Sequence, residues 1–285
     1  MTVTDLLSPI GRLAENRLAL VGGILILIVS LMAVLAPHVA PHDPRQTDLE
    51  QSLTAPNRTF PLGTNKLGRC VLSQMIYGAR VTLAVGVGVV LVSALVGMIL
   101  GVVSGYYGGM VDEVIMRLVD VMFALPGILP ALIIAGLLGP RILNLMLALT
   151  VTAWAAYARI VRGSVLTIKP LPFVESANAL GASHLYIIRV HIIPNCLAPV
   201  IVLATFGVAR AILAVSALSF LGLGCQAPNF DWGAMLKESL LYMRSAPHLV
   251  IFPGLAIMLL VLAFNFLGDG LRDIMDVQSN RKNGY

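Results

Sequence analysis

Residues 81–105 decide the fold; they read VTLAVGVGVVLVSALVGMILGVVSG and contain no charged side chain. A hydrocarbon core of about 30 Å is crossed by about 20 helical residues, so this stretch is long enough to span a membrane. Because an unpaired peptide group in lipid costs several kcal/mol, the stretch must be helical. Its small residues favour close packing against neighbouring helices, and they are Gly86, Gly88, Ser93, Ala94, Gly97 and Gly101.

The rest of the chain repeats this character. Further apolar stretches lie at residues 18–36, 119–139, 142–161, 197–221 and 249–267. With 58% hydrophobic and only 12% charged residues, the chain is too apolar for a soluble protein of this length. None of the stretches shows the alternation of a membrane β-barrel. We therefore predict an all-α integral membrane protein with six transmembrane helices, the first of which is too long in its apolar core to be a cleaved signal.

Residues 173–195 lie between two apolar spans and read FVESANALGASHLYIIRVHIIPN. The segment resembles the EAA loop of ABC-importer permeases, which has a glutamate, small residues, a glycine six positions later and an apolar-proline pair about a dozen residues further on. The resemblance implies a short cytoplasmic helix that fits a groove of a separate ATPase subunit. The residues that it assigns to ATPase coupling are Glu175, Ser176, Ala177, Gly181, Ala182 and Pro194. Ser176 replaces an alanine of the family pattern, a small-for-small change.

Local chemistry predicts how this loop is built. Pro170 and Pro172 exclude helix immediately upstream, and Glu175 falls in the first helical turn, where a negative charge suits the helix dipole. Gly181 can end the short helix in the left-handed conformation, and Ser183 can cap the next helix. The expected structure is helix, sharp turn, helix, and its rigid junction with a membrane span would tilt that span when the ATPase moves.

Four ordered motifs extend the resemblance over nearly the whole chain. They are LGTNKLGRCVLSQMIYGARVTL at 62–83, YARIVRG at 157–163, SFLGLG with Ala227-Pro228 and Trp232-Gly233 within 218–233, and FNFLGDGLRD at 264–273. They are similar to the peptide and nickel branch of these permeases. The resemblance implies the type I ABC-importer architecture. We expect an N-terminal segment at 1–80, with the first span and an extracytoplasmic loop, followed by a five-helix permease core at 81–285.

The resemblance also implies partners. They are a second homologous permease subunit, two ATPase subunits and an extracytoplasmic substrate-binding protein. The resemblance also places the chain in the inner membrane of a bacterium, with both termini in the cytoplasm.

The chain has no Gly-Lys pair, HExxH or GxSxG, so it is not expected to be an enzyme or to bind a cofactor. ATP and Mg²⁺ would be held by the partner ATPases. The net charge of +5 indicates lipid contact and not nucleic-acid binding, because no basic run exceeds two residues.

Arg210 is the candidate for the substrate path, because it lies well inside the fifth span. A guanidinium there costs several kcal/mol unless it is paired or hydrated, so it should face a cavity or a partner helix. A cationic site would suit a peptide carboxyl terminus or an anionic metal chelate. The alternative is snorkelling or a structural bond to helix carbonyls. Asp120 is a possible partner or an interfacial residue, and peptide-branch relatives often have an acidic residue where this chain has Ala214.

Three residues in the outer loop depart from the branch pattern. Asn65, Cys70 and Gln74 stand where aspartate, aspartate and arginine are common, so a small charged group has become neutral as a whole. One interpretation is compensated change, since losing all partners of an ion-pair group can be nearly neutral. The other is altered docking of the binding protein. Cys70 and Cys225 would both face the exterior as two free thiols or as a disulfide.

The cargo follows from the branch and not from single residues. We expect short peptides, with nickel or a metal chelate as the alternative. His38, His42 and His248 could all lie near the outer surface as nickel ligands, although lone interfacial histidines are commoner, and we predict no metal site. A secondary transporter would carry several mid-membrane acidic residues or repeats, and a membrane enzyme would need clustered His, Asp or Glu in its spans. The sequence has neither feature.

Overall fold

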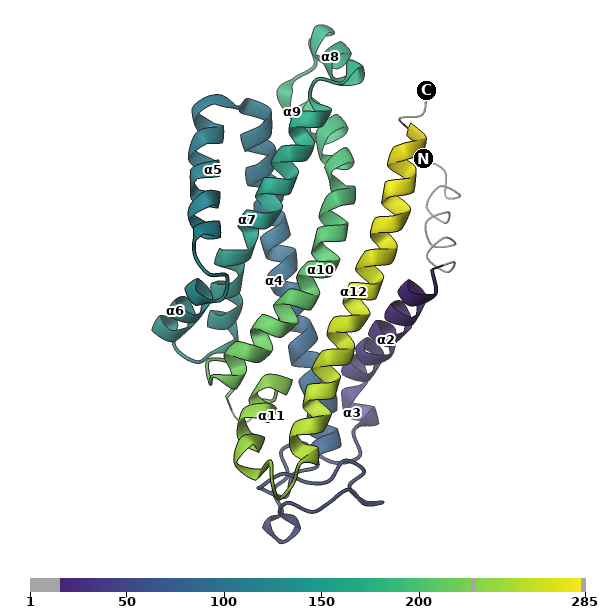
Figure 1. Cartoon of the computed structure of the whole chain (residues 1–285), viewed down its shortest axis with the longest axis vertical. Helices are drawn as coiled ribbons and strands as arrows, with labels where there is room; N and C mark the ends of the chain where they lie inside the picture. Colours follow the sequence, from purple (N-terminus) through teal and green to yellow (C-terminus); the bar gives the residue numbers. More distant parts are fainter. Residues whose placement is uncertain (1–15, 227–228, 283–285) are drawn as a thin grey trace.

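The computed structural model describes residues 16–226 and 229–282, with side chains described as far as residue 275. Its regular structure is helical, with no strand among these residues. Five helices are long and apolar enough to cross a membrane (Figure 1). They are α2 (Arg17–Val34), α4 (Val71–Tyr107), α7 (Ile142–Ile168), α10 (Ile193–Phe220) and α12 (His248–Lys282). The predicted all-α membrane fold is confirmed.

The predicted third span is not one helix. It is a pair, α5 (Gly109–Ala124) and α6 (Leu129–Leu138), bent by 91° at the break between them. Leu125 precedes Pro126 and has extended backbone angles, because a residue before proline is pushed out of the helical region. Pro130 lies in the first turn of α6, where its missing N–H is tolerated. The stretch predicted at residues 119–139 is therefore divided between two helices, and it counts as the sixth span only if the bent pair is taken as one.

α4 begins earlier than expected. It starts at Val71, ten residues before the predicted start of the second span, and runs without interruption to Tyr107. Residues 71–80 of the first motif are therefore helical, and the boundary that we expected at residue 80 falls inside α4. At about 1.5 Å per residue this helix is about 55 Å long and extends beyond both faces of a bilayer core.

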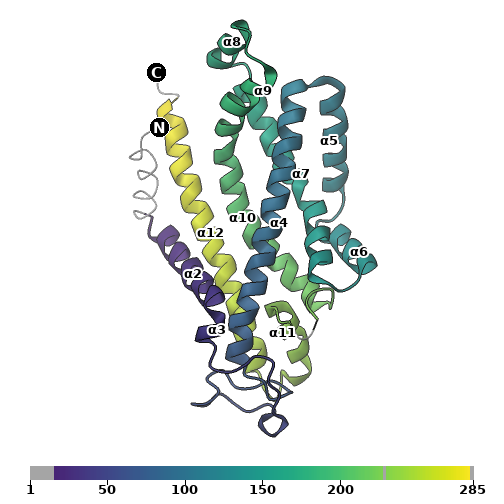
Figure 2. The ribbon, with the colours of Figure 1, turned by 180° about the vertical axis from the view of Figure 1, so that it is seen from behind.

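The two ends of the bundle differ. One end, called here the α8 end, carries the short helices α8 (Pro172–Ala179) and α9 (His184–Ile187) and the last turns of α12 (Figures 1 and 2). The opposite α11 end carries α3 (Ala36–Val39), the loop of residues 40–70, α11 (Trp232–Ser239) and the turn η3 (Leu240–Tyr242). The loop contains one short 3-10 turn, η1 (Leu49–Gln51).

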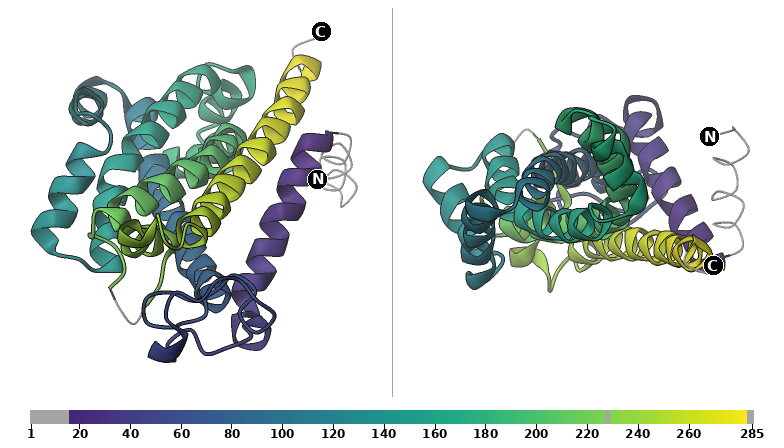
Figure 3. Two further views of the ribbon diagram at one scale, coloured as in Figure 1. Left: turned by 60° about the horizontal axis from the view of Figure 1, so that its bottom comes forward. Right: turned by 90° about the horizontal axis from the view of Figure 1, so that it is seen from above.

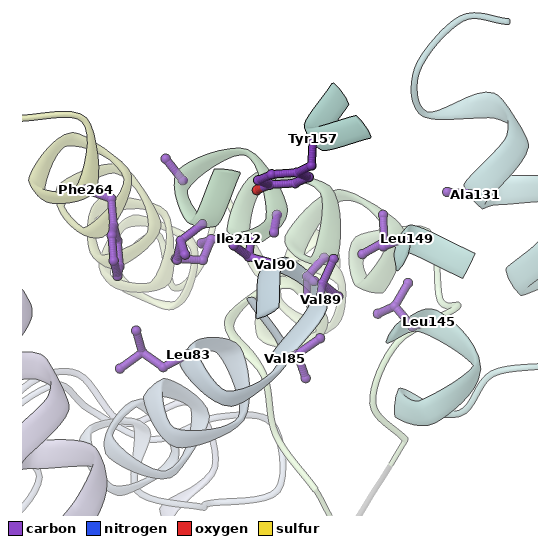
Figure 4. Packing of buried hydrophobic residues seen from close by; sticks show 14 of the residues in the cluster. Leu83, Val85, Val89, Val90, Ala131, Leu145, Leu149, Tyr157, Ile212 and Phe264 are labelled. Carbon is purple, nitrogen blue, oxygen red and sulfur yellow. The ribbon is translucent and has the colours of Figure 1, made fainter. Parts of the chain in front are cut away.

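Close contact between α4 and α7 forms the centre of the bundle. A β-carbon on Gly97 would lie 2.4 Å from the β-carbon of Tyr157, and one on Gly101 would lie 2.6 Å from the carbonyl oxygen of Ala158. A β-carbon on Gly105, one turn further along α4, would lie 2.8 Å from the β-carbon of Val165. The glycine face predicted from the sequence is thus a packing surface. Figure 4 shows the adjoining core, where side chains from α4, α7, α10 and α12 meet.

α2 is attached to the outside of the bundle along α12 (Figure 3). A β-carbon on Gly22 would lie 2.5 Å from the carbonyl oxygen of Ala263, and Gly270 of α12 makes the reciprocal close approach to Ala19. Gly23, the next residue of α2, has no atom within 4 Å of its β-carbon position. One face of α2 is therefore in tight contact and the neighbouring position is open.

We predict that Gly22→Leu lowers the thermal denaturation midpoint of the purified protein in detergent, whereas Gly23→Leu leaves it nearly unchanged. Overpacking of a tight contact costs about 1–3 kcal/mol, and only position 22 has a neighbour to clash with. The two variants add the same side chain to the same helix, so they match in hydrophobicity. Equal midpoints would contradict the α2–α12 packing.

Candidate functional site: coupling loop and membrane cavity

The loop at the α8 end has the predicted helix–turn–helix form. α8 begins at Pro172, and Glu175 lies in its first turn. Gly181 adopts a φ of +81°, the left-handed conformation that favours glycine. The hydroxyl of Ser183 then accepts a hydrogen bond from the backbone N–H of Tyr186 at 3.3 Å and caps α9. These local features of the segment at 173–195 are confirmed.

The loop joins the membrane helix without a flexible break. α9 is followed by one π-helical turn, η2 (Ile188–Ile192), and α10 begins at Ile193 with Pro194 in its first turn. Wider helical turns of this kind are rare and often occur at functional positions. No sequence signal that we used predicted the π turn. α9, η2 and α10 therefore form one continuous helical backbone.

The tip of the loop exposes apolar side chains. Leu180 is 88% exposed and Leu185 is 74% exposed, whereas Val174 and Ile187 are buried and hold the loop together. Glu175 and Ser176 are also exposed, and Ala177 and Ala182 are partly buried against the core. An apolar tip on a protruding helix pair is typical of a protein-binding surface.

Two contacts that the sequence did not predict fasten the loop to α4. The hydroxyl of Tyr106 lies 2.9 Å from Nδ1 of His184, the first residue of α9. Lys169, which follows α7, donates from Nζ to the carbonyl oxygen of Tyr106 at 2.7 Å. The last turn of α4, the end of α7 and the start of α9 are thus joined at one residue, and Tyr106 itself is buried.

The YARIVRG motif holds α5 against α7. Arg162 donates from Nε and Nη2 to the two carboxylate oxygens of Asp112 at 2.6 and 2.5 Å, and Ser104 of α4 also donates to Asp112. Such paired charge-assisted bonds fix geometry as well as adding energy. The sequence contained a signal for this ion pair. The two helices are antiparallel neighbours, so Asp112 near the start of α5 lies beside Arg162 near the end of α7.

Asp120 is not the partner of Arg210. It accepts a hydrogen bond from Nη2 of Arg159 at 2.7 Å, and the Arg159 guanidinium also stacks over the Phe123 ring at 4.0 Å. Of the two roles considered for Asp120, the role of partner to Arg210 is not the one that the structure shows. The reason is geometric, since Asp120 lies on α5 and faces α7, while Arg210 belongs to α10.

A cavity of about 580 Å³ lies among α4, α5, α7, α10 and the break between α5 and α6. Arg210 lines it, together with Phe123, Tyr157 and mostly small or aliphatic side chains. Arg210 is exposed, and it makes no hydrogen bond or ion pair with any residue in the described part of the chain. The sequence-based expectation that Arg210 faces a cavity agrees with this geometry.

With the loop and the cavity in place, the comparison with known proteins is decisive. Residues 97–278 match the family described as binding-protein-dependent transport system inner membrane components, and residues 10–56 match the N-terminal membrane domain of oligopeptide transport permease C. The chain belongs to this family of ABC-importer permeases.

Individual relatives define the branch. The chain is 42% identical over 268 residues to the dipeptide transport system permease protein DppC of Haemophilus influenzae, covering 92% of this chain and 91% of the relative. It is 40% identical over 266 residues to the glutathione transport system permease protein GsiD of Pectobacterium atrosepticum, with 93% and 88% covered. The permease therefore lies in the peptide and glutathione branch.

A solved structure agrees on the fold. A crystal structure titled as an amino acid ABC transporter with histidines is similar at a TM-score of 0.50 and 19% identity, over 70% of this chain and 91% of that chain. At this level of identity the likeness concerns the arrangement of helices only.

At the α11 end of the permease, two of the three departures from the branch pattern are in contact. Asn65 donates from Nδ2 to Oε1 of Gln74 at 3.2 Å, so a neutral pair occupies the positions that are commonly charged. Gln74 is buried and also donates to the carbonyl oxygen of Pro44. The contact supports compensated change, and the effect on binding-protein docking stays a prediction.

Cys70 and Cys225 are free thiols, as is Cys196. Burial, with the nearby Asp231 carboxylate, raises the pKa of the Cys225 thiol to about 12, which keeps it protonated at neutral pH. Since thiolate is the reactive form, Cys225 is poorly suited to disulfide exchange. Asp231 is itself buried, its pKa is raised by burial, and it caps α11 by accepting from the N–H of Ala234 at 3.0 Å.

α11 is fixed to the start of α4 by its first residue. Trp232 donates from Nε1 to the carbonyl oxygen of Met75 at 3.0 Å, which explains part of the motif at 218–233. Ala227 and Pro228 of that motif lie outside the described residues. Among the described residues there is no group of three His, Cys, Asp or Glu side chains that could hold a metal ion.

We predict that Tyr106→Phe speeds hydrogen–deuterium exchange of the backbone at residues 180–187, measured by mass spectrometry on the purified permease. The change removes the hydroxyl that bonds to His184 and leaves the ring in place. Tyr107→Phe is the control, since its side chain makes only ring contacts with Tyr106 and His184 in the described structure. Equal exchange in both variants would show that the Tyr106–His184 bond does not hold the loop.

Proposed function

We propose that this permease imports short peptides across the bacterial inner membrane as one half of a heterodimeric pathway. The observation that carries the cargo class is its 42% identity to a dipeptide permease over 92% of the chain. The second half would be a homologous permease subunit. An extracytoplasmic binding protein would deliver the peptide, and two ATPase subunits that bind ATP and Mg²⁺ would drive transport.

The loop at 173–195 supports the coupling part of the proposal. Its apolar tip, with Leu180 and Leu185 exposed, suits a groove on an ATPase subunit. Glu175, Ser176, Ala177, Gly181, Ala182 and Pro194 would form or shape the docking surface and its junction with α10. Because nucleotide is in the cytoplasm, the α8 end would face it, and so would both chain termini, while the α11 end would meet the binding protein.

The mechanism would be alternating access. ATP binding would draw the two ATPases together and move α8 sideways, and the continuous path through α9 and η2 would tilt α10. The Tyr106 contact would carry the same movement into α4, which reaches the α11 end. Hydrolysis would then reset the permeases.

We predict that Glu175→Arg or Gly181→Arg leaves membrane insertion intact and abolishes binding-protein-stimulated ATP hydrolysis by the reconstituted complex. The first change reverses the charge in the first turn of α8, and the second strains a residue at φ +81°. Glu113→Arg is a matched control, because Glu113 is an exposed glutamate of α5 whose 3.9 Å ion pair is weak. Unchanged stimulated hydrolysis in both loop variants would remove the coupling role.

The cargo is tested by loading the cognate binding protein in turn with a dipeptide mixture, nickel and a nickel chelate, and measuring ATP hydrolysis by the complex in proteoliposomes. We expect stimulation by the dipeptides alone. Stimulation only by nickel or its chelate would contradict the peptide assignment while leaving the importer architecture in place.

A further inference from the structure

The α10 side of the cavity carries a single polar side chain, that of Arg210. Gly207, Arg210 and Ala214 all line it, and their spacing of three and four residues places them on one face of the helix. Thr152 and Tyr157 are the other lining residues with polar side chains. Thr152 already donates to the carbonyl oxygen of Leu149 at 2.9 Å. The Tyr157 hydroxyl lies against Gly207, so close that a β-carbon there would overlap it.

Charge around the cavity is not balanced. Asp120 and Arg159, which border it at Phe123, neutralise one another through their 2.7 Å contact. Arg210 is the charged residue that lines the cavity itself, and no acidic residue is in the lining. A cation in an apolar cavity costs several kcal/mol unless water or an anion meets it. Arg210 is exposed in this cavity, and the residues that line it supply no counter-charge.

Arg210 is also deep in the bundle. It lies ten residues from the end of α10 at Phe220, about 15 Å, and seventeen residues from the beginning at Ile193, about 25 Å. The guanidinium therefore belongs to the middle of the pathway and not to a mouth. Pockets of about 300–1,000 Å³ commonly hold small ligands, and the cavity volume of about 580 Å³ falls in this range.

We propose that Arg210 binds the carboxylate terminus of the peptide as it crosses the membrane. The inference rests on the proposed function, because it assumes a peptide cargo. Every linear peptide has one C-terminal carboxylate whatever its side chains, and guanidinium groups bind carboxylates through two parallel hydrogen bonds. One arginine among aliphatic walls can thus hold the constant part of varied cargo. The hydroxyl of Tyr157, a residue of α7, lies beside Gly207 on the face of α10 that carries Arg210, and it can donate a further hydrogen bond to the carboxylate.

The test compares import of a dipeptide with import of its C-terminal amide by the complete complex in proteoliposomes. The peptide is chosen so that the binding protein is saturated by both forms, as measured by calorimetry. Removing one charge-assisted bond changes a rate by about tenfold or more, so the wild type is expected to prefer the free acid by about this factor. Arg210→Gln should reduce the preference to less than about twofold by lowering the maximal rate for the acid.

Arg141→Gln is the matched control. Arg141 precedes α7 at the α11 end, is exposed and does not line the cavity. The Arg141→Gln complex should therefore keep the full wild-type preference for the free acid over the amide. Arg210→Lys keeps the charge but loses the paired geometry, so an intermediate preference is expected.

A second variant leaves Arg210 in place. Ala214→Glu puts a carboxylate one turn away on the same face, where it can pair with Arg210 and compete with the peptide. It should reduce the preference as Arg210→Gln does, whereas Ala214→Gln, of the same size, should retain most of it.

The outcomes are separable. If the wild-type complex imports neither peptide, the proposed function fails. If it imports peptides and Arg210→Gln keeps the wild-type preference, or the wild type has none, the carboxylate site is refuted. Failure of Arg210→Gln to co-purify with the second permease, together with unchanged preference in Ala214→Glu, would also overturn it and would assign Arg210 to the contact between permeases.

Discussion

The close approach of α4 and α7 is the contact on which the rest of this permease depends. Gly97 and Gly101 allow the two backbones to meet at distances that a β-carbon would prevent. α7 then carries Tyr157 to the cavity, Arg159 and Arg162 to α5, and the chain to Lys169 and the loop. In a bilayer, where apolar side chains gain little by leaving lipid, such small-residue packing supplies much of the specificity of helix association.

α4 connects the two ends of the molecule. Its last turn is bonded to the loop through Tyr106, and its first turns are bonded to the opposite end through Gln74 and the Met75 carbonyl. The helix is unbroken over the 37 residues between these two sets of contacts. The coupling route expected from the sequence involved only α10, and the contacts of α4 make it a candidate for a second route under the proposed function.

Local chemistry was predictable and long-range pairing was not. Gly181 and Ser183 were assigned correctly because a left-handed turn and an N-cap depend on the residue and its immediate neighbours. The prolines on either side of the break between α5 and α6 explain why the helix stops there, but the 91° bend depends on packing that the sequence does not display. Arg159, the partner of Asp120, lies 39 residues further along the chain, and predicting this pair requires knowing which faces of α5 and α7 are in contact.

The pair formed by Asn65 and Gln74 has a consequence for the conditions in which the transporter works. An aspartate–arginine pair at these positions would lose one of its charges when acid protonates the carboxylate, whereas neutral amides do not titrate. In the proposed orientation this loop is extracytoplasmic, where the surroundings and not the cell set the pH. A neutral pair joins the first turn of α4 to the loop through a hydrogen bond that does not depend on the ionisation of either side chain.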